Sequence, residues 1–351
     1  MLAELAFLAL AGCRSPDSTQ QLHRFEFKQP HMGALFTLIL YAPDEPAARH
    51  ASDAAFARIA ALESIMTDYD PESELMRLCQ QPVGRPVRVS DELFEVLEKS
   101  QRVAELSEGA FDVTIGPVIR LWRRTRRTTE LPSAEVLARA QAAVGWRKLK
   151  LDGRQKTATL AVPNMQLDLG GIGKGFAADK ALEVLKQHGV TRALIAASGD
   201  IAVSDPPPGQ RGWRVSIGTP DFATDGTNQA SQQRSGVQTG GPMVRTLLLK
   251  NAAVSTAGDS EQFVEIGGVH YSHIVDPRTG VGLTNRLQVS VIARRATDAD
   301  AFDTTVRVLG VERGLALIES QPRLAALVLT TDGRQTLTIE SSGMKRIARY
   351  W

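Results

Sequence analysis

The sequence predicts an α+β protein in which strands and helices alternate irregularly along one chain. Three hairpin signals, at Asp152-Gly153, Gly267-Gly268 and Asp332-Gly333, join runs of alternating polar and apolar residues. Helical periodicity occurs between such runs, without the steady βαβ rhythm of a doubly wound parallel sheet. The chain has 351 residues, of which 43% are hydrophobic and 23% charged, so it can bury a large core.

The first half of the chain is predicted to start with two strands and continue with helices. Residues 24–41 have the pattern of two short strands around a turn at 30–33. Residues 45–67 carry apolar side chains at helical spacing. Ser90 is an N-cap candidate for a helix that Gly109 closes, and residues 133–145 repeat this pattern.

The second half contains a strand, a helix and a long loop. Residues 165–169 alternate like a strand, and residues 176–188 have helical spacing that ends at Gly189. Residues 204–243 are rich in Pro, Gly, Ser, Thr and Gln, which predicts a long loop with one strand-like run at 213–217.

The N-terminus has the pattern of a lipoprotein leader. An apolar stretch leads to Leu10-Ala-Gly-Cys13, so residues 1–12 are expected to be a signal peptide, residues 13–22 a lipidated Cys13 with its tether, and 23–351 the main domain. The leader is short, lacks Lys and Arg and contains Glu4; the alternative is a buried helix with an incidental cysteine. Cys79 is then expected to be a packed thiol, and no run is long enough to span a bilayer.

The charge balance argues against nucleic acid as a partner. The net charge is +2, whereas nucleic-acid binding normally needs a clearly basic domain. The basic run at 123–127 is the local exception. We interpret it as a solvated helix end, with a phosphate or anionic-lipid contact as the alternative.

A glycine-rich segment at 168–175 could approach an anion closely. Its glycines let the backbone come near a ligand, and the N-terminus of the following helix offers N–H groups. Lys174 adds a positive charge. The segment matches neither a Walker A loop nor the dinucleotide fingerprint, and a tight turn without a ligand is the alternative.

Two further segments carry chemistry-bearing side chains. In a helix, Asp300 and Thr304 share a face with Asp303 beside them, which is a cluster of hard oxygen ligands for Mg²⁺. The alternative is that Asp303 and Thr304 cap the start of a helix. His273 ends the second strand of the Gly267-Gly268 hairpin, where it could be a general base, a phosphate donor or a packed residue.

Taken together, seven ordered motifs resemble the ApbE family, the bacterial FAD:protein FMN transferases. The resemblance runs from about Met32 to beyond Leu309. Two departures are the segment Ala197-Ser-Gly-Asp200, where the family usually has a second glycine pair, and the extended loop at 204–243. The motifs are Met32-Gly33, Tyr69-Asp-Pro-Glu-Ser-Glu-Leu75, Gly109-Ala-Phe-Asp-Val-Thr-Ile-Gly-Pro117, Asp168-Leu-Gly-Gly-Ile-Gly-Lys-Gly175, Ser255-Thr-Ala-Gly258, Tyr271-Ser-His-Ile-Val-Asp-Pro-Arg-Thr-Gly280 and Ala299-Asp-Ala-Phe-Asp-Thr304.

The resemblance implies a fold of two interlocked lobes with a flavin site between them. It also implies Mg²⁺-dependent cleavage of FAD, with FMN passed to a Thr or Ser of an acceptor protein as a phosphoester and AMP released. By motif, the metal ligands are Asp300, Asp303, Thr304 and a backbone carbonyl near Gly171. The FAD contacts by motif are Met32, Tyr69, Ala110, Phe111, Asp112, Asp168, Lys174 and Val275.

The chemistry of a pyrophosphate agrees with this assignment. Its cleavage needs a cation and donors around the charge that develops on phosphate oxygens, which Asp300, Asp303 and Lys174 could provide. We hypothesise that His273, or a nearby carboxylate such as Asp276, accepts the proton of the incoming hydroxyl. Tyr69 and Phe111 could stack on a ring of FAD.

Two alternatives share the site: an FAD pyrophosphatase that yields FMN and AMP, and a lipid-anchored FAD-binding protein without catalysis. The predicted magnesium ligands speak against simple storage. By resemblance, the acceptor is an exported or membrane-bound redox subunit with a Ser/Thr flavinylation motif. The expected location is the bacterial cell envelope, with a lipid anchor in the membrane and the enzyme facing the periplasm.

Overall fold

A computed structural model describes residues 21–218, 243–258, 262–331 and 336–350. Its centre is an eight-stranded antiparallel sheet in the order β1-β2-β6-β7-β10-β15-β16-β17. This mixture of sheet and helices confirms the predicted α+β class. The strands are β1 His23–His31, β2 Ala34–Ala42, β6 Ala193–Ala197, β7 Asp200–Val203, β10 Ala252–Ala257, β15 Leu287–Ala293, β16 Ala325–Thr331 and β17 Thr336–Glu340.

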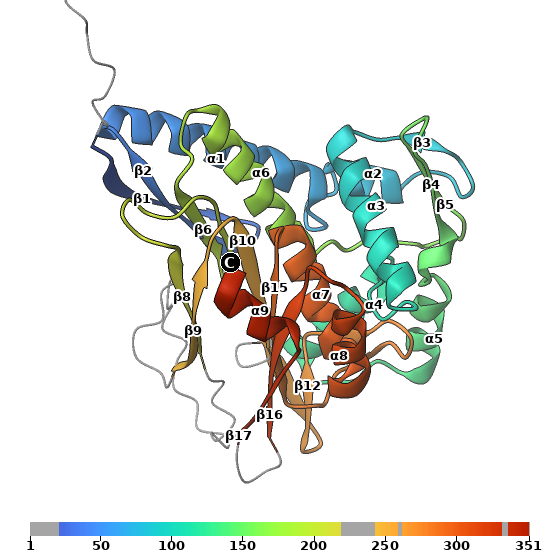
Figure 1. Ribbon diagram of the computed structural model, residues 1–351. Coiled ribbons are helices and arrows are strands. Elements are labelled where there is room, and N and C mark those ends of the chain that lie inside the picture. Colours follow the sequence, from blue (N-terminus) through green and yellow to red (C-terminus); the bar gives the residue numbers. More distant parts are fainter. Residues whose placement is uncertain (1–20, 219–242, 259–261, 332–335, 351) are drawn as a thin grey trace, which may run out of the picture.

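Both faces of this sheet are covered. Side chains alternate between the faces of a strand, and in β2 Phe36 and Leu38 join one buried cluster while Ile39 joins another. The first face lies under α1 Glu45–Met66, α6 Gly173–Gln187 and α7 Ala296–Leu309 (Figure 1). The second face packs against the hairpin of β8 Trp213–Gly218 and β9 Met243–Leu249, and against Met344 of α9 Gly343–Tyr350.

Helix α8 Val311–Glu319 packs against α7 and β16, whereas the remaining helices form a second part beside the sheet (Figure 1). Its small sheet has the order β3-β5-β4, and two further hairpins, β11–β12 and β13–β14, follow later in the chain. These elements are α2 Glu74–Cys79, β3 Val87–Arg88, α3 Asp91–Leu106, α4 Gly116–Thr128, α5 Ala134–Ala142, η1 Trp146–Lys148, β4 Leu149–Asp152, β5 Thr157–Leu160, β11 Phe263–Ile266, β12 Val269–Ser272, β13 Val275–Asp276 and β14 Val281–Gly282.

Most local predictions are confirmed. The Oγ atoms of Ser90 and Ser133 accept hydrogen bonds from the N–H groups of Leu93 and Val136, so both serines are N-caps. The hairpins at Asp152-Gly153 and Gly267-Gly268 are present. Strands β16 and β17 pair on either side of Asp332-Gly333, although that turn lies outside the described residues.

One predicted element is wrong, and one begins earlier than expected. Residues 165–169 form no strand; Gln166 makes a single parallel bridge to Ile115. The segment is extended because the N–H of Asp168 donates to the Val113 carbonyl over 2.8 Å, but it has no partner strand on which to form a ladder. Helix α6 starts at Gly173 rather than Phe176, which places Lys174 in its first turn.

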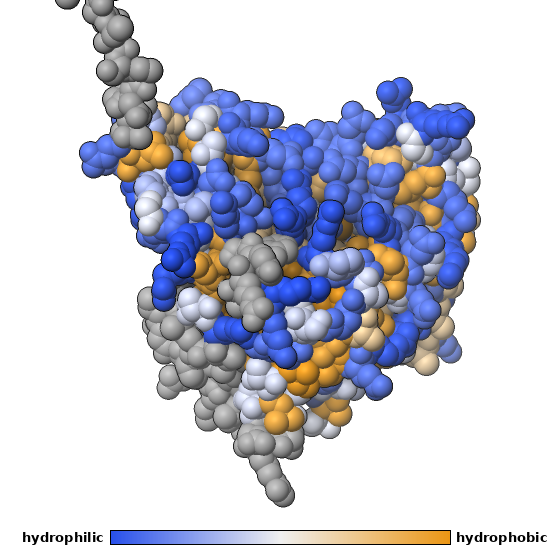
Figure 2. All heavy atoms as spheres, viewed as in Figure 1, coloured by the Kyte–Doolittle hydropathy of each residue, from blue (hydrophilic) through white to orange (hydrophobic). Residues whose placement is uncertain are grey.

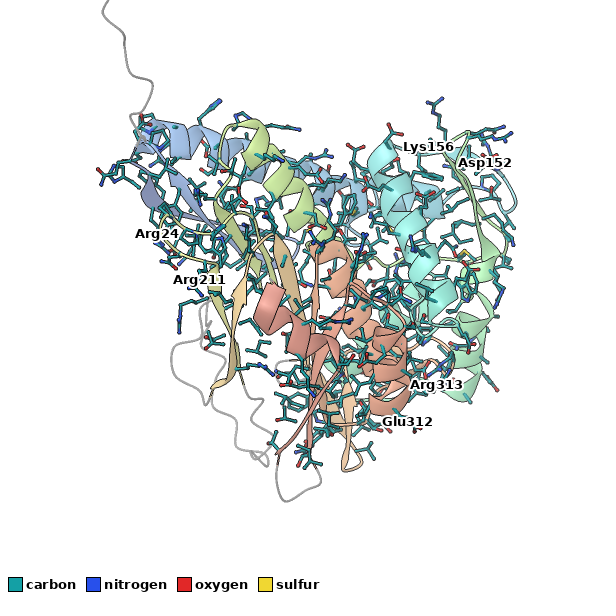
Figure 3. All side chains as sticks on the ribbon, viewed as in Figure 1. Arg24, Asp152, Lys156, Arg211, Glu312 and Arg313 are labelled. Carbon is teal, nitrogen blue, oxygen red and sulfur yellow. The ribbon has the colours of Figure 1, made fainter. Side chains whose placement is uncertain are left out.

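The predicted signal peptide, Cys13 and most of the tether lie outside the described residues, as do residues 219–242 of the predicted loop. In the part that the structure covers, none of the helices has the length and apolar composition needed to cross a membrane. Charged side chains such as Arg24, Arg211, Asp152 and Lys156 lie at the rim of the molecule (Figure 3). The face in Figure 2 is a mixture of hydrophilic and hydrophobic residues.

Candidate functional site

The candidate site lies where the start of α6 meets the middle of α7. Helix α7 spans Ala296–Leu309, so Asp300 and Thr304 share a face as predicted, and the residues are not capping groups at a helix start. Asp300 and Asp303 are only 3% and 2% exposed. The N–H of Gly175 donates to Oδ2 of Asp300 over 2.9 Å, which joins the two helices at the site.

Two residues of α6 fix the position of α7. A Cβ atom on Gly175 would lie 2.2 Å from the carbonyl oxygen of Ala296, so only glycine permits this approach. One turn later, the buried Asp179 accepts hydrogen bonds from the N–H groups of Ala296 and Thr297, each at 3.0 Å. It also accepts a bond from the hydroxyl of Thr297 at 2.6 Å. Asp179 therefore caps α7 from a neighbouring helix.

The sheet contributes two polar residues to the same site. Nζ of Lys174 lies 2.9 Å from Oδ2 of Asp200 at the start of β7. The hydroxyl of Ser255, on β10, contacts the carboxylates of both Asp200 and Asp303, the latter at 2.5 Å. The motifs Ala197-Ser-Gly-Asp200 and Ser255-Thr-Ala-Gly258 contain these two residues, but no role was predicted for either of them.

The carboxylates outnumber the cation in this buried cluster. Burial, with the neighbouring charge of Asp200, raises the pKa of Asp300 to about 7. Burial and the charge of Asp300 raise the pKa of Asp303 well above its ordinary value. Burial opposes the charge of Lys174, but Asp200 and Asp300 outweigh it and raise the Lys174 pKa. An additional cation beside the carboxylates would therefore be stabilised.

The donor set fits a hard cation. A Cβ atom on Gly171 would lie 3.3 Å from Oγ1 of Thr304 and 3.3 Å from the ring of Phe111, so this backbone turn faces α7. Two carboxylates, a hydroxyl and a backbone carbonyl, completed by water, are ligands that Mg²⁺ accepts. No group of three or more His, Cys, Asp and Glu side chains forms a metal site in the described ranges, so the non-carboxylate oxygens are essential to this fit.

The sequence predicted that free N–H groups at the start of α6 could bind an anion. This prediction is wrong for most of the turn, because these groups already donate to acceptors within the protein. The N–H of Gly170 donates to Asp168, and that of Gly175 donates to Asp300. The N–H groups of Ile172 and Gly173 both donate to the Leu169 carbonyl. The glycines therefore shape a compact turn that holds Asp300, and Lys174 is the main positive group of the segment.

Asp168 and Tyr69 meet through an arginine. Nη2 of Arg123 lies 2.9 Å from Oδ2 of Asp168, and the same guanidinium pairs with Asp68. It also lies over the ring of Tyr69, 4.3 Å from the ring centroid. The structure thus brings two predicted FAD contacts together at one arginine of α4. This member of the basic run at 123–127 is an ion-paired residue rather than part of a solvated helix end.

The other predicted FAD contacts are mostly buried. Ala110, Phe111 and Val275 are 1%, 4% and 3% exposed. The carboxylate of Asp112 accepts bonds from Thr114 and from the N–H of Trp146, so it holds its own loop.

Met32 lies in the β1–β2 turn with a φ of 51°, and its N–H donates to Glu63 in the last turn of α1, a helix that ends at Met66 just before Tyr69.

His273 and Asp276 lie on the segment around β13. Nδ1 of His273 is 3.0 Å from the carbonyl oxygen of Gln262, and Gln262 in turn contacts Arg126 of α4. The carboxylate of Asp276 pairs with Arg278 through two hydrogen bonds of 2.8 and 2.7 Å and accepts a third from its N–H. Asp276 therefore stabilises its own turn. The roles of both residues in proton transfer stay predictions.

Cys79 is a packed thiol, as expected. The N–H of Leu167 donates to its Sγ over 3.3 Å. Burial raises the pKa of this thiol to about 11, so it is a poor nucleophile at neutral pH.

Most of the chain is similar to proteins of one known family. The model of the ApbE family matches residues 32–328. An FAD:protein FMN transferase of Vibrio cholerae is 29% identical over 338 residues, covering 95% of this chain and 94% of the relative. One from Haemophilus influenzae is 30% identical and covers 80% of this chain and 79% of the relative.

Solved structures agree with these relatives. The apo form of the Pseudomonas stutzeri flavinyl transferase ApbE superposes with a TM-score of 0.80 at 28% identity, covering 93% of this chain and 97% of that one. The Vibrio cholerae flavin transferase ApbE has a TM-score of 0.80 at 26% identity, covering 93% and 99%. The resemblance inferred from the seven motifs is confirmed.

Proposed function

The chain belongs to the ApbE family, and we propose that its buried oxygen site serves, with Mg²⁺, the transfer of FMN from FAD to an acceptor protein that this enzyme carries out. The FMN is attached as a phosphoester to a Ser or Thr hydroxyl, and AMP leaves. One observation carries the proposal: Asp300 and Asp303 are buried beside Asp200 with Lys174 as their only close cation in the described chain.

Asp300, Asp303, Thr304 and the carbonyl near Gly171 would hold the ion. Bound Mg²⁺ supplies positive charge to the phosphate oxygens of FAD. Lys174 donates a hydrogen bond to a phosphate oxygen, and Asp200 orients its ammonium group from 2.9 Å. Ser255 holds the carboxylate of Asp303, so the ligand keeps its orientation before the substrate arrives.

The covalent step exchanges the phosphoanhydride bond of FAD for a phosphoester bond to the acceptor. The acceptor hydroxyl oxygen forms a bond to the phosphorus of the FMN half, the bond from that phosphorus to the bridging oxygen breaks, and AMP takes the bridging oxygen. His273 receives the hydroxyl proton. Because a carbonyl can only accept, Nδ1 carries the proton in the bond to Gln262, and Nε2 is the basic atom of the ring. The internal pairing of Asp276 supports His273 over Asp276 for this role.

The acceptor is an exported or membrane-bound redox subunit with a Ser/Thr flavinylation motif. Lipidation of Cys13 anchors the enzyme in the membrane of the cell envelope, where it faces the periplasm. The sequence Leu10-Ala-Gly-Cys13 supports this part of the proposal.

The test is to incubate the purified protein with FAD and Mg²⁺, with and without a candidate acceptor domain, and to follow AMP and the intact mass of the acceptor. A mass gain equal to FMN that is lost on chelation and in Asp300→Ala supports the proposal. Release of AMP and free FMN without labelling of any acceptor would indicate a pyrophosphatase. Intact bound FAD with every acceptor tried would contradict both.

A further inference from the structure

One arginine of the basic run at 123–127, Arg123, forms ion pairs with two distant acids and has no part in the proposed covalent step. We propose that Arg123 is a positioning residue that holds Tyr69 and the Asp168 turn in their binding arrangement before FAD arrives. The proposal deepens the proposed function, because it concerns the same substrate site. It rests on contacts between three segments that are far apart in the sequence.

Arg123 connects these segments through one guanidinium. It pairs with Asp68, which follows α1, and with Asp168, which precedes α6, the second pair at 2.9 Å. The side chains of both acids are 11% exposed, while that of Arg123 is 20% exposed. A planar guanidinium presents several N–H donors in a fixed fork, so it can serve two carboxylates at once, whereas an ammonium is a point charge.

Without Arg123 the two acids would face each other with their main counter-ion gone. Burial and the charge of Asp68 raise the pKa of Asp168, and the positive charge of Arg123 opposes this rise. Loss of the guanidinium would therefore favour separation of the two segments or protonation of one acid. Either result disturbs the turn at 168–171.

The same guanidinium supports an exposed aromatic ring. Tyr69 is 77% exposed, which is unusual for a large aromatic side chain. Arg123 covers one face of its ring at 4.3 Å from the centroid. A cation over one face fixes the ring orientation and leaves the other face for a planar group such as a ring of FAD.

Asp168 extends this arrangement to the oxygen site. Its Oδ1 accepts from the N–H of Gly170 at 2.8 Å, which shapes the turn that carries Gly171 next to Thr304. Arg123 thereby joins the aromatic platform to the turn that faces the magnesium ligands. The side chain of the exposed neighbour Arg124 forms no hydrogen bond, ion pair or ring contact with described residues, so it offers a matched control on the same helix.

The experiment compares Arg123→Gln, Arg123→Lys and Arg124→Gln in the full chain. Hydrogen exchange of the free protein is measured at residues 67–73 and 167–171, and FAD affinity is measured by flavin fluorescence in EDTA. We expect Arg123→Gln to exchange faster in both segments and to bind FAD about ten- to a hundredfold more weakly, the range set by one hydrogen bond to a charged group. Arg123→Lys is intermediate, and Arg124→Gln behaves as wild type.

A second comparison separates positioning from general destabilisation. In a Tyr69→Ala background, Arg123→Gln should weaken FAD binding less than in the wild type, because the two residues act on one ring. Equal effects in both backgrounds, or wild-type exchange and FAD affinity in Arg123→Lys and Arg123→Gln, would overturn the proposal. If wild-type protein binds no FAD at all, the proposed function fails, while exchange in the two segments still decides the role of Arg123. If Arg123→Gln does not fold, Arg123→Lys decides it.

Discussion

The backbone N–H of Gly175 and Oδ2 of Asp300 form a 2.9 Å hydrogen bond that joins α6 to α7 at the oxygen site. The contact requires a residue without a side chain at 175, because a Cβ atom there would meet both the Ala296 carbonyl and the Cβ of Asp300 at 2.8 Å or less. The glycine-rich motif is therefore needed for helix packing as well as for its turn.

Gly175→Ala should separate α6 from α7. We expect the free energy of unfolding to fall by about 2–3 kcal/mol, as for an overpacked core, and FMN transfer to be lost because Asp300 moves. The control for stability is Gly173→Ala on the same helix, where the added Cβ meets only a Cβ at 4.0 Å. Urea unfolding measures both variants, and an equal effect in the two would contradict this packing argument.

Asp179→Ala should weaken the start of α7. It leaves two N–H groups and the hydroxyl of Thr297 without their acceptor, at a cost of about 2–3 kcal/mol. Asp179→Asn retains an acceptor oxygen and should cost less. If Asp179 positions the metal ligands, both variants need more Mg²⁺ for half-maximal transfer, whereas a kcat loss at unchanged Mg²⁺ dependence would oppose that role.

Local signals predicted much of the fold. The caps Ser90 and Ser133 and the spacing of Asp300 and Thr304 depend on neighbours within one or two helical turns, and a single sequence contains that information. The strand predicted at 165–169 failed because alternation does not reveal whether a partner strand exists.

The rest of the site depends on distant partners. Asp179 caps a helix more than a hundred residues away, and the contact of Ser255 with Asp200 follows from the β7–β10 pairing in the sheet. Arg123 looked like part of a solvated run because charge patterning gives no information on tertiary ion pairs. Such contacts form only when the chain folds and brings distant segments together.

Removal of one carboxylate should separate stability from activity. In the absence of metal, Asp303→Asn relieves repulsion with Asp300, so the melting temperature should stay the same or rise while transfer is lost. Mg²⁺ at a hundred times its dissociation constant should stabilise the wild type by about 2.7 kcal/mol and the variant much less. The measurement is thermal unfolding with and without Mg²⁺. If Mg²⁺ stabilised the wild type and Asp303→Asn equally, the ion would bind elsewhere.

Cys79 should react slowly in the native protein. With its pKa near 11, the thiol has about a hundredfold less thiolate at pH 8 than an ordinary cysteine. Alkylation by iodoacetamide, read by peptide mass so that Cys13 is distinguished, should be slow until urea is added. Because Leu167 donates to its Sγ, labelling also reports opening next to Asp168, and bound FAD should slow it further. Fast native labelling would show that this contact is open in solution.

His273→Ala should lose transfer while FAD binding is retained. A positioned base contributes about 10²–10⁴-fold, so transfer should fall within that range, and added imidazole should restore part of it. Asp276→Asn should lose less than His273→Ala, because the Asp276 carboxylate already pairs with Arg278 and its loss weakens a turn. The measurement is single-turnover acceptor labelling across pH 6–9, with FAD binding in EDTA as the control. A wild-type rate in His273→Ala at every pH would assign the proton to another group, and a larger loss in Asp276→Asn would favour the carboxylate.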